Sequence, residues 1–242
     1  MHALTTRQVE LFTTQGYLAI DRITSDHEVM ELRALYDRIL ADPSVFSLRF
    51  EGGAIHQVMT PEIQYPELRE TAYFRTGRRL ACQLLGITED NLDGFFTHMI
   101  YKPPRSERDT PWHQDEAYWN NVDTVAHSVS VWMPLDPVRV ESGCMQFVPG
   151  SHDTDVRRHR RLDGWPPLLM IDEDVDLSPA VACPLAPGGA TFHHCRTLHY
   201  TAPNTTHTPR RAWSLAFHAK ASRRATVFEK PWLAFAAPAA AT

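Results

Sequence analysis

The sequence has little lysine and no long apolar run, and each shortage excludes a class of partner. Lysine stands only at Lys102, Lys220 and Lys230, and the formal charge of the 242 residues is −5. Such a balance gives no general basic surface, so no nucleic-acid partner is expected. No apolar stretch reaches the roughly 18–20 residues that cross a bilayer, and the first residues contain no apolar signal region. Neither a membrane partner nor export is therefore expected.

The sequence also lacks paired cysteines. Cys82, Cys144, Cys183 and Cys195 lie far apart and form no Cys-x-x-Cys motif. A chain of this size, 43% of it hydrophobic, can bury a core without a disulfide framework. We therefore expect reduced thiols, a cytoplasmic location and a single domain.

The first third of the chain has the periodicity of helices. Thr5–Gln8 and Ser25–Glu28 each fit a capping box, which would start a helix, and Tyr17–Ile20 between them reads as a strand. A third helix is expected over residues 66–85, ending at Gly86. Residues 1–90 are therefore predicted to be a mostly helical part that packs on a sheet.

Beyond residue 90 the pattern changes to short strands separated by turn residues. Ser128–Met133 alternates between polar and apolar residues, which predicts a half-buried strand. Further strands are expected over residues 95–101, 144–148, 190–193 and 212–218. The predicted fold is mainly β with N-terminal helices, in which residues 91–222 form the core and residues 223–242 a C-terminal tail.

Two further segments have a weaker pattern. Residues 157–169 mix charged and apolar residues and are expected to form a mobile loop. The Ala-rich tail after residue 235 is expected to fray.

His113 and Asp115 are the first candidates for chemistry. In an extended segment residues i and i+2 face the same way, so both can bind one metal ion from a single strand end. A third ligand must then come from a distant strand, and His199 is our choice, with His193 and His194 as alternatives. Among 13 histidines one His-x-Asp arises easily by chance, so the prediction rests on the whole set.

Arg210 completes that set. Two histidines and one carboxylate can occupy one face of a ferrous ion and leave the other face open for a bidentate cosubstrate and oxygen. The planar guanidinium of Arg210 can then bind a carboxylate of that cosubstrate. The combination predicts an oxygenase that uses Fe(II), 2-oxoglutarate and O₂.

Several neighbours are candidates for a substrate pocket. Trp112, Tyr118 and Trp119 could stack on a small-molecule substrate, although packing inside a β-sandwich explains them equally well. Gln114 belongs to the same run, but alternation turns it away from the metal face. Arg158 lies in an arginine-rich run that could bind an anionic substrate, although such runs more often form solvated loops.

These motifs together resemble the phytanoyl-CoA hydroxylase family of iron- and 2-oxoglutarate-dependent oxygenases. The resemblance extends over nearly the whole chain, and it is carried by Trp112–Asp115, Ser130–Asp136, Glu141–Met145, Val148–His152, Gly188–Ala190, His199–Thr201 and Arg210–Ala212.

The resemblance implies a double-stranded β-helix, or jelly-roll, with a metal at one mouth. The ligands implied by motif position are His113, Asp115 and His199. The positions implied to contact 2-oxoglutarate or to line its pocket are Arg210, Thr201, Lys102 and Trp132. Tyr200 stands where the family usually has Gly, so Tyr200 joins the pocket candidates.

The resemblance also implies a reaction. We expect oxidation of an unactivated C–H bond in a sugar-containing or other secondary metabolite, by hydroxylation or by oxidative ring closure such as orthoester formation. Succinate and CO₂ would be released, and the protein would be a monomer or homodimer. Halogenating relatives have Ala or Gly at the position of Asp115, so halogenation is not expected. Two other functions stay open: a jelly-roll binding or scaffold protein with a vestigial metal site, and a metal-dependent cupin-type isomerase, which needs no cosubstrate arginine.

Overall fold

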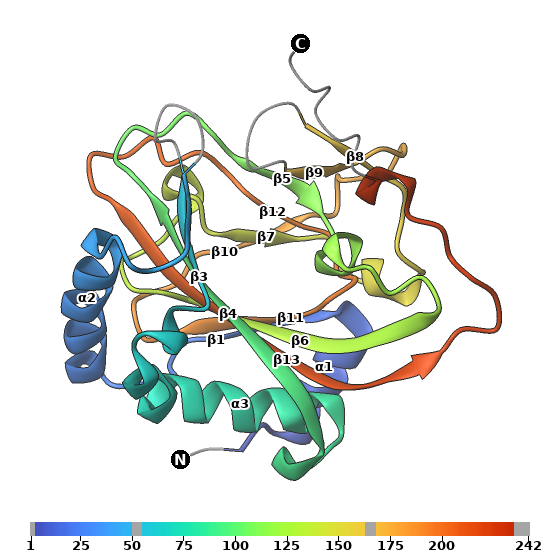
Figure 1. Cartoon of the computed structure of the whole chain (residues 1–242), viewed down its shortest axis with the longest axis horizontal. Coiled ribbons are helices and arrows are strands. Elements are labelled where there is room, and N and C mark those ends of the chain that lie inside the picture. The colour runs from blue at the N-terminus through green and yellow to red at the C-terminus, as the bar shows by residue number, and fades with distance from the viewer. Residues whose placement is uncertain (1–2, 50–54, 163–167, 235–242) are drawn as a thin grey trace.

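In the part of the chain that the structure describes, two antiparallel β-sheets enclose the site region, and three α-helices lie outside the larger sheet. The computed structural model describes residues 3–49, 55–162 and 168–234 (Figure 1). In spatial order the larger sheet contains β1 (Tyr17–Ile20), β11 (Ala190–His194), β6 (Thr124–Pro134), β13 (Arg210–Arg223), β4 (Leu92–Lys102), β3 (His56–Met59) and β2 (Ser47–Arg49). The smaller sheet contains β10 (Val181–Cys183), β7 (Met145–Phe147), β12 (His199–Thr201) and β5 (Thr110–His113). This is the mainly β architecture with N-terminal helices that was predicted.

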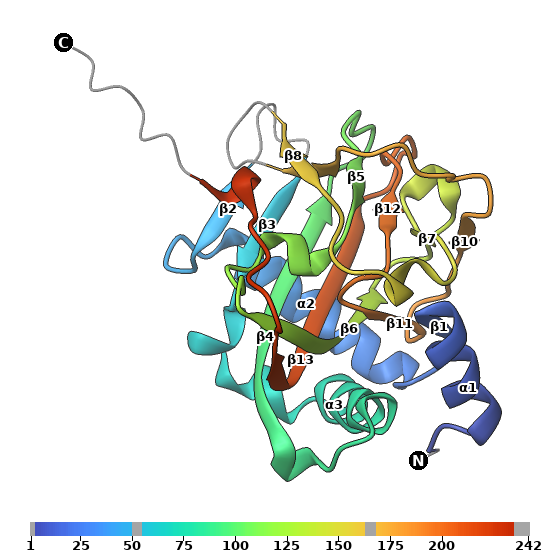
Figure 2. The ribbon, with the colours of Figure 1, turned by 90° about the vertical axis from the view of Figure 1, so that its right-hand side faces the viewer.

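The three helices cover the outer face of the larger sheet (Figures 1 and 2). They are α1 (Thr6–Gln15), α2 (Asp26–Ala41) and α3 (Ala72–Leu85). Helix α1 starts at the predicted capping box of Thr5 and Gln8, and it ends at Gly16, whose φ of 79° suits glycine. None of the helices that the structure describes is long and apolar enough to cross a membrane.

The expected helix over residues 66–85 is interrupted. Pro66–Glu70 forms a short 3-10 helix, and α3 begins only at Ala72 because the Thr71 side chain accepts a hydrogen bond from the Phe74 N–H. The second capping box is half formed. Ser25 accepts from the Glu28 N–H, but the Glu28 carboxylate bonds the Tyr73 N–H (2.9 Å) and so joins α2 to α3.

Strand burial also differs from the prediction. Residues 128–134 are all buried, not half-buried, because α3 packs on the outer side of β6 and β13. The N-terminal part contributes β2 and β3 to the edge of the larger sheet, so it is less helical than expected.

Residues 157–169 are not simply a loop. β8 (His159–Arg161) and β9 (Leu169–Ile171) pair in a small antiparallel sheet of their own. The remainder of that segment, residues 163–167, and the tail beyond residue 234 lie outside the described residues. The described part after β13, residues 224–234, crosses the body of the protein rather than leaving it (Figure 2).

Tyr73 provides a test of how α3 is joined to the sheet. Its buried hydroxyl lies 3.0 Å from the Val131 carbonyl and 2.9 Å from the Trp213 carbonyl. Tyr73→Phe should lower the free energy of unfolding by about 1–2 kcal/mol in denaturant titrations, because a buried hydrogen bond is lost. Tyr65→Phe is the control, since its hydroxyl bonds Asp42 where the residue is only partly buried. Equal losses in the two variants would contradict this account.

Candidate metal centre

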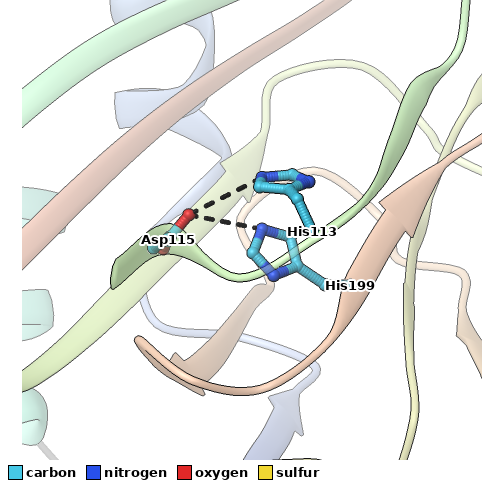
Figure 3. Close-up of side chains that lie close together, drawn as sticks. All are labelled: His113, Asp115 and His199. Atoms are coloured by element: carbon cyan, nitrogen blue, oxygen red, sulfur yellow. Dashed lines mark ion pairs between the residues drawn. The ribbon is translucent and has the colours of Figure 1, made fainter. Parts of the chain in front are cut away.

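Three side chains bring possible metal-binding atoms together between the sheets (Figure 3). His113, Asp115 and His199 each offer one such atom, and these atoms lie within 4.8 Å of one another. The two histidines are direct partners across the β5–β12 pairing. Asp115 begins the 3-10 turn Asp115–Tyr118 that follows β5, which we call the metal turn. Its Oδ1 lies 3.4 Å from Nε2 of His199 and 3.8 Å from Nε2 of His113.

The main chain fixes the tautomers of both histidines. Nδ1 of His113 lies 2.7 Å from the Pro111 carbonyl, and Nδ1 of His199 lies 2.9 Å from the Thr197 carbonyl. A carbonyl can only accept, so both Nδ1 atoms carry a hydrogen, and each Nε2, which faces Asp115, is the ring atom available to a metal. Burial, reinforced by repulsion from His199, lowers the pKa of His113 to about 3, so that imidazole is neutral at pH 7.

The second carboxylate oxygen of Asp115 is held by the larger sheet. Its Oδ2 accepts a hydrogen bond from Ser130 Oγ (2.7 Å) and one from His193 Nε2 (3.2 Å). Ser130 and His193 face each other across β6 and β11. Burial raises the pKa of Asp115, but attraction to His199 and hydrogen bonds from His193 and His199 outweigh it and hold that pKa well below its usual range. The carboxylate is therefore ionised, with Oδ1 directed at the two ligand histidines.

The two alternative ligands lie elsewhere. His193 bonds the far oxygen of Asp115, and its own Nδ1 is buried with no partner among the described residues. His194 accepts the Arg196 N–H through Nδ1 (3.2 Å) and packs against the ring of His152. The only described set of three residues that could hold an ion is the predicted one.

The donor set suits Fe(II). Two neutral imidazole nitrogens and one ionised carboxylate oxygen are the facial ligands of non-haem iron sites, in which the remaining positions stay open. His113 and His199 are buried and Asp115 is partly buried, its side chain 25% exposed and lining a cavity of about 840 Å³. A cavity of this volume falls in the range of small-molecule sites, roughly 300–1,000 Å³.

Strand β13 runs the length of this cavity. Arg210, Ser214, Ala216 and His218, which share one face of the strand, all line it. Ala216 is the cross-strand partner of Ser130, which bonds Asp115. The metal-binding residues therefore lie between the Arg210 end and the His218 end of the cavity.

Arg210 gives one end of the cavity a buried positive charge. Its side chain is 1% exposed, its Nη1 donates to the Ile100 carbonyl (3.4 Å), and its Nε has no partner among the described residues. The guanidinium carbon lies 5.6 Å from the ring centre of Trp132, which also lines the cavity. Burial lowers the pKa of Arg210 to about 10, so Arg210 remains charged at neutral pH.

Lys102 lies behind this end and not in it. Its fully buried ammonium donates to Thr201 Oγ1 (2.9 Å) and to the carbonyls of Thr201 (3.2 Å) and Ala202 (2.8 Å). Lys102 is absent from the described lining of the cavity, whereas Thr201 is part of it. Because Thr201 Oγ1 accepts from Lys102, its own hydroxyl hydrogen can point into the cavity.

The structure separates the predicted pocket residues into two groups. Tyr118, Trp119 and Tyr200 line the cavity, and the ring of Trp119 meets His218 edge-on at 5.2 Å. The remaining predicted residues do not line it: Trp112 stacks on the outer side of Tyr200, Gln114 bonds the main chain of Arg157 and Arg196, and Arg158 pairs with Asp172 at the surface.

Sequence reasoning missed Ser130, His98, His218 and the strands β2 and β3. Ser130 had a usable signal, because it alternates with Trp132 on β6 and so shares its face. His98 pairs with Ser214 across β4 and β13, which no local pattern reveals. The strands β2 and β3 are only three and four residues long, too short for periodicity to identify.

Holding Asp115 by its second oxygen should matter for metal affinity. We expect Ser130→Ala and His193→Leu each to weaken Co(II) or anaerobic Fe(II) binding by about 10–100-fold in equilibrium dialysis, because the carboxylate loses an orienting partner. Ser128→Ala is the matched control, since Ser128 lies on the same strand but donates to the Phe217 carbonyl. If Ser130→Ala bound metal as tightly as Ser128→Ala, Asp115 would be oriented by other contacts.

The chain was compared with known proteins. Residues 12–212 match the family described as phytanoyl-CoA dioxygenase (PhyH). Phytanoyl-CoA dioxygenase domain-containing protein 1 of Danio rerio is 29% identical over 139 residues, which cover 55% of this chain and 47% of that protein. The chain spans about half the length of this protein and of two homologues from nematodes.

Two solved structures are similar over nearly the whole chain. EvdO2 from Micromonospora carbonacea var. aurantiaca, solved with 2-oxoglutarate, is 37% identical with a TM-score of 0.84, covering 97% of this chain and 98% of its own. The epimerase SnoN, in complex with Fe³⁺, alpha ketoglutarate and nogalamycin RO, is 26% identical with a TM-score of 0.73, covering 90% and 85%. The match over residues 12–212, with the jelly-roll fold and the triad in place, shows that the chain belongs to the phytanoyl-CoA dioxygenase (PhyH) family of Fe(II)- and 2-oxoglutarate-dependent oxygenases.

Proposed function

We propose that this protein oxidises an unactivated C–H bond of a sugar-containing secondary metabolite, by hydroxylation or oxidative ring closure, with release of succinate and CO₂. The observation that carries the proposal is that one cavity is lined by both the metal-binding triad and a buried arginine, Arg210, whose Nε has no hydrogen-bond partner among the described residues. A cupin-type isomerase would need no such arginine. A vestigial scaffold would have no reason to keep the supporting bonds to Asp115.

Each of these residues would have its own role in binding the metal or the cosubstrate. His113, Asp115 and His199 would hold Fe(II), which when bound with 2-oxoglutarate and O₂ supplies the oxidising power for the C–H bond. Arg210 would bind the distal carboxylate of 2-oxoglutarate with its guanidinium, and the Thr201 hydroxyl would donate to the same carboxylate. Lys102 would keep Thr201 in place from behind. Trp132 would cover one side of the guanidinium and keep water from it.

The chemistry of the remaining cavity favours an uncharged substrate. Among the described lining residues only Asp115 and Arg210 carry a formal charge. Burial lowers the pKa of His98 to about 4 and also lowers the pKa of His218, so both imidazoles are neutral at pH 7. Aromatic and aliphatic side chains provide the other surfaces, among them Phe46, Met59, Phe96, Trp119 and Leu168.

Rings with few charges fit such walls. Aromatic faces can pack against the apolar face of a sugar or of a fused-ring system, while neutral imidazoles exchange hydrogen bonds with hydroxyl groups. A CoA ester would need cations for its phosphates, and the described lining offers only Arg210. SnoN, a relative that acts in nogalamycin biosynthesis, supports the choice of a secondary metabolite.

The first test is succinate formation from 2-oxoglutarate by anaerobically loaded Fe(II) protein after oxygen is admitted. We expect turnover in the wild type, none in His113→Ala, and wild-type turnover in His27→Ala, whose side chain is 78% exposed on α2. Candidate substrates are then added. Glycosylated natural products should stimulate turnover, and stimulation by acyl-CoA or free amino acids alone would contradict the proposed substrate class.

Arg210 and Arg211 form a matched pair for the cosubstrate. Arg211 follows Arg210 in the sequence but pairs with Asp37 and Asp136 outside the cavity. Arg210→Lys should raise the KM for 2-oxoglutarate by about 10–100-fold, because a planar two-point contact with the carboxylate is lost. Arg211→Lys should leave that KM within about twofold. Equal effects in steady-state kinetics would place the carboxylate elsewhere.

A further inference from the structure

The segment that follows β13 lies beyond the end of the family match. The match ends at residue 212, whereas the structure describes the chain to residue 234. We call residues 224–234 the C-terminal strap. Figure 2 shows it, in red, leaving the end of β13 and running across the molecule toward β8. It thereby crosses the metal turn Asp115–Tyr118.

The strap binds the main chain of the metal turn directly. Lys230 Nζ donates to the carbonyls of Glu116 (2.7 Å) and Trp119 (2.8 Å) and to the Asn121 side chain. Trp232 Nε1 donates to the Ala117 carbonyl (2.9 Å). Carbonyls at the end of a short helical turn have no partner within the turn. The strap supplies a partner for the Ala117 carbonyl and a second one for the Glu116 carbonyl, which also accepts the Trp119 N–H (3.2 Å).

The burial of Lys230 indicates that its bonds are specific. Its side chain is only 5% exposed, and a buried ammonium is tolerated only when acceptors surround it. The side chain of Glu116 is fully buried beneath the turn. Its carboxylate provides the compensating negative charge and forms ion pairs with Arg196 (3.4 Å) and Arg224 (3.4 Å). Arg224 belongs to the strap and also bonds the Thr124 carbonyl (2.8 Å).

Apolar packing holds the strap in the same place. Trp232 is buried with Ala117 of the metal turn, Val156 and Leu169 of β9. Its ring also lies 5.6 Å from that of His159, which accepts the N–H of Gln114, the residue between the two ligands of the His-x-Asp motif. The strap therefore contacts the metal turn by hydrogen bonds and supports the preceding residue through His159.

We propose that the C-terminal strap, through Lys230 and Trp232, is a positioning element that holds the metal turn so that Asp115 meets the metal and Trp119 meets the substrate. The inference rests on the proposed function, because it assumes that the triad binds a metal. It goes beyond that function by giving residues outside the family match a part in building the site.

Metal affinity tests the proposal. Lys230→Met keeps the length of the side chain and removes its donors, and we expect it to weaken Co(II) or anaerobic Fe(II) binding about 10-fold in equilibrium dialysis of the full chain. Lys220→Met, at an exposed position of β13, should bind as the wild type does. Tyr73→Phe controls for stability, because it destabilises the fold from the side of the larger sheet that α3 covers and should leave metal affinity unchanged.

The outcomes separate a positioning role from a structural one. If Lys230→Met binds metal within twofold of the wild type while its Tm falls as in Tyr73→Phe, the strap only stabilises the fold and the proposal is overturned. Should Lys230→Met fail to fold, Trp232→Phe carries the test, since it keeps an aromatic ring and loses one donor. Wild-type protein that bound no metal would overturn the proposed function first and this inference with it.

Discussion

The pairing of β12 with β5 is the constraint on which the site depends, because it sets His199 directly opposite His113. Opposite residues in an antiparallel pair have Cα atoms only about 4.5–5.5 Å apart and point to the same face. A slip of one residue would turn either imidazole to the other side of the sheet. Pairing of β12 with β7 on its other edge fixes this register, since His199 is held there opposite Phe147.

The larger sheet supplies the hydrogen-bond donors that orient Asp115 by its second oxygen. Ser130 and His193, partners on the larger sheet, bind the oxygen of Asp115 that faces away from the histidines. A buried carboxylate needs such partners to remain ionised, so the distance between the two sheets is set by polar contacts as well as by packing. Two buried atoms keep no described partner near the site, Nδ1 of His193 and Nε of Arg210. Both belong to residues that line the cavity.

Sequence reasoning reached the features that are encoded locally. The His-x-Asp pair, the cap of α1 at Thr5 and the strand β6 each depend on neighbouring residues, and each formed where expected. His199, far away in the sequence, was chosen among three histidines on the whole set of motifs, and the structure places it beside the other two ligands. The features it missed depend on residues far apart in the chain. Burial of both faces of β6 needs α3, the support of Asp115 by His193 needs the β6–β11 register, and the β8–β9 pair breaks up a segment that looked like a loop.

The distribution of charge in the cavity gives the proposed function its selectivity. Arg210 is the sole cation of the described lining, and a carboxylate-bearing cosubstrate would neutralise it. A second anion would then find no counter-charge, and losing its water without one is unfavourable. An anionic substrate could therefore bind only by displacing the cosubstrate that its oxidation requires. Under the proposed function, anionic competitors would be rejected by the absence of a partner for them, while uncharged rings could still use the aromatic walls. Discrimination of this kind would leave the shape of those walls to decide which neutral molecule reacts.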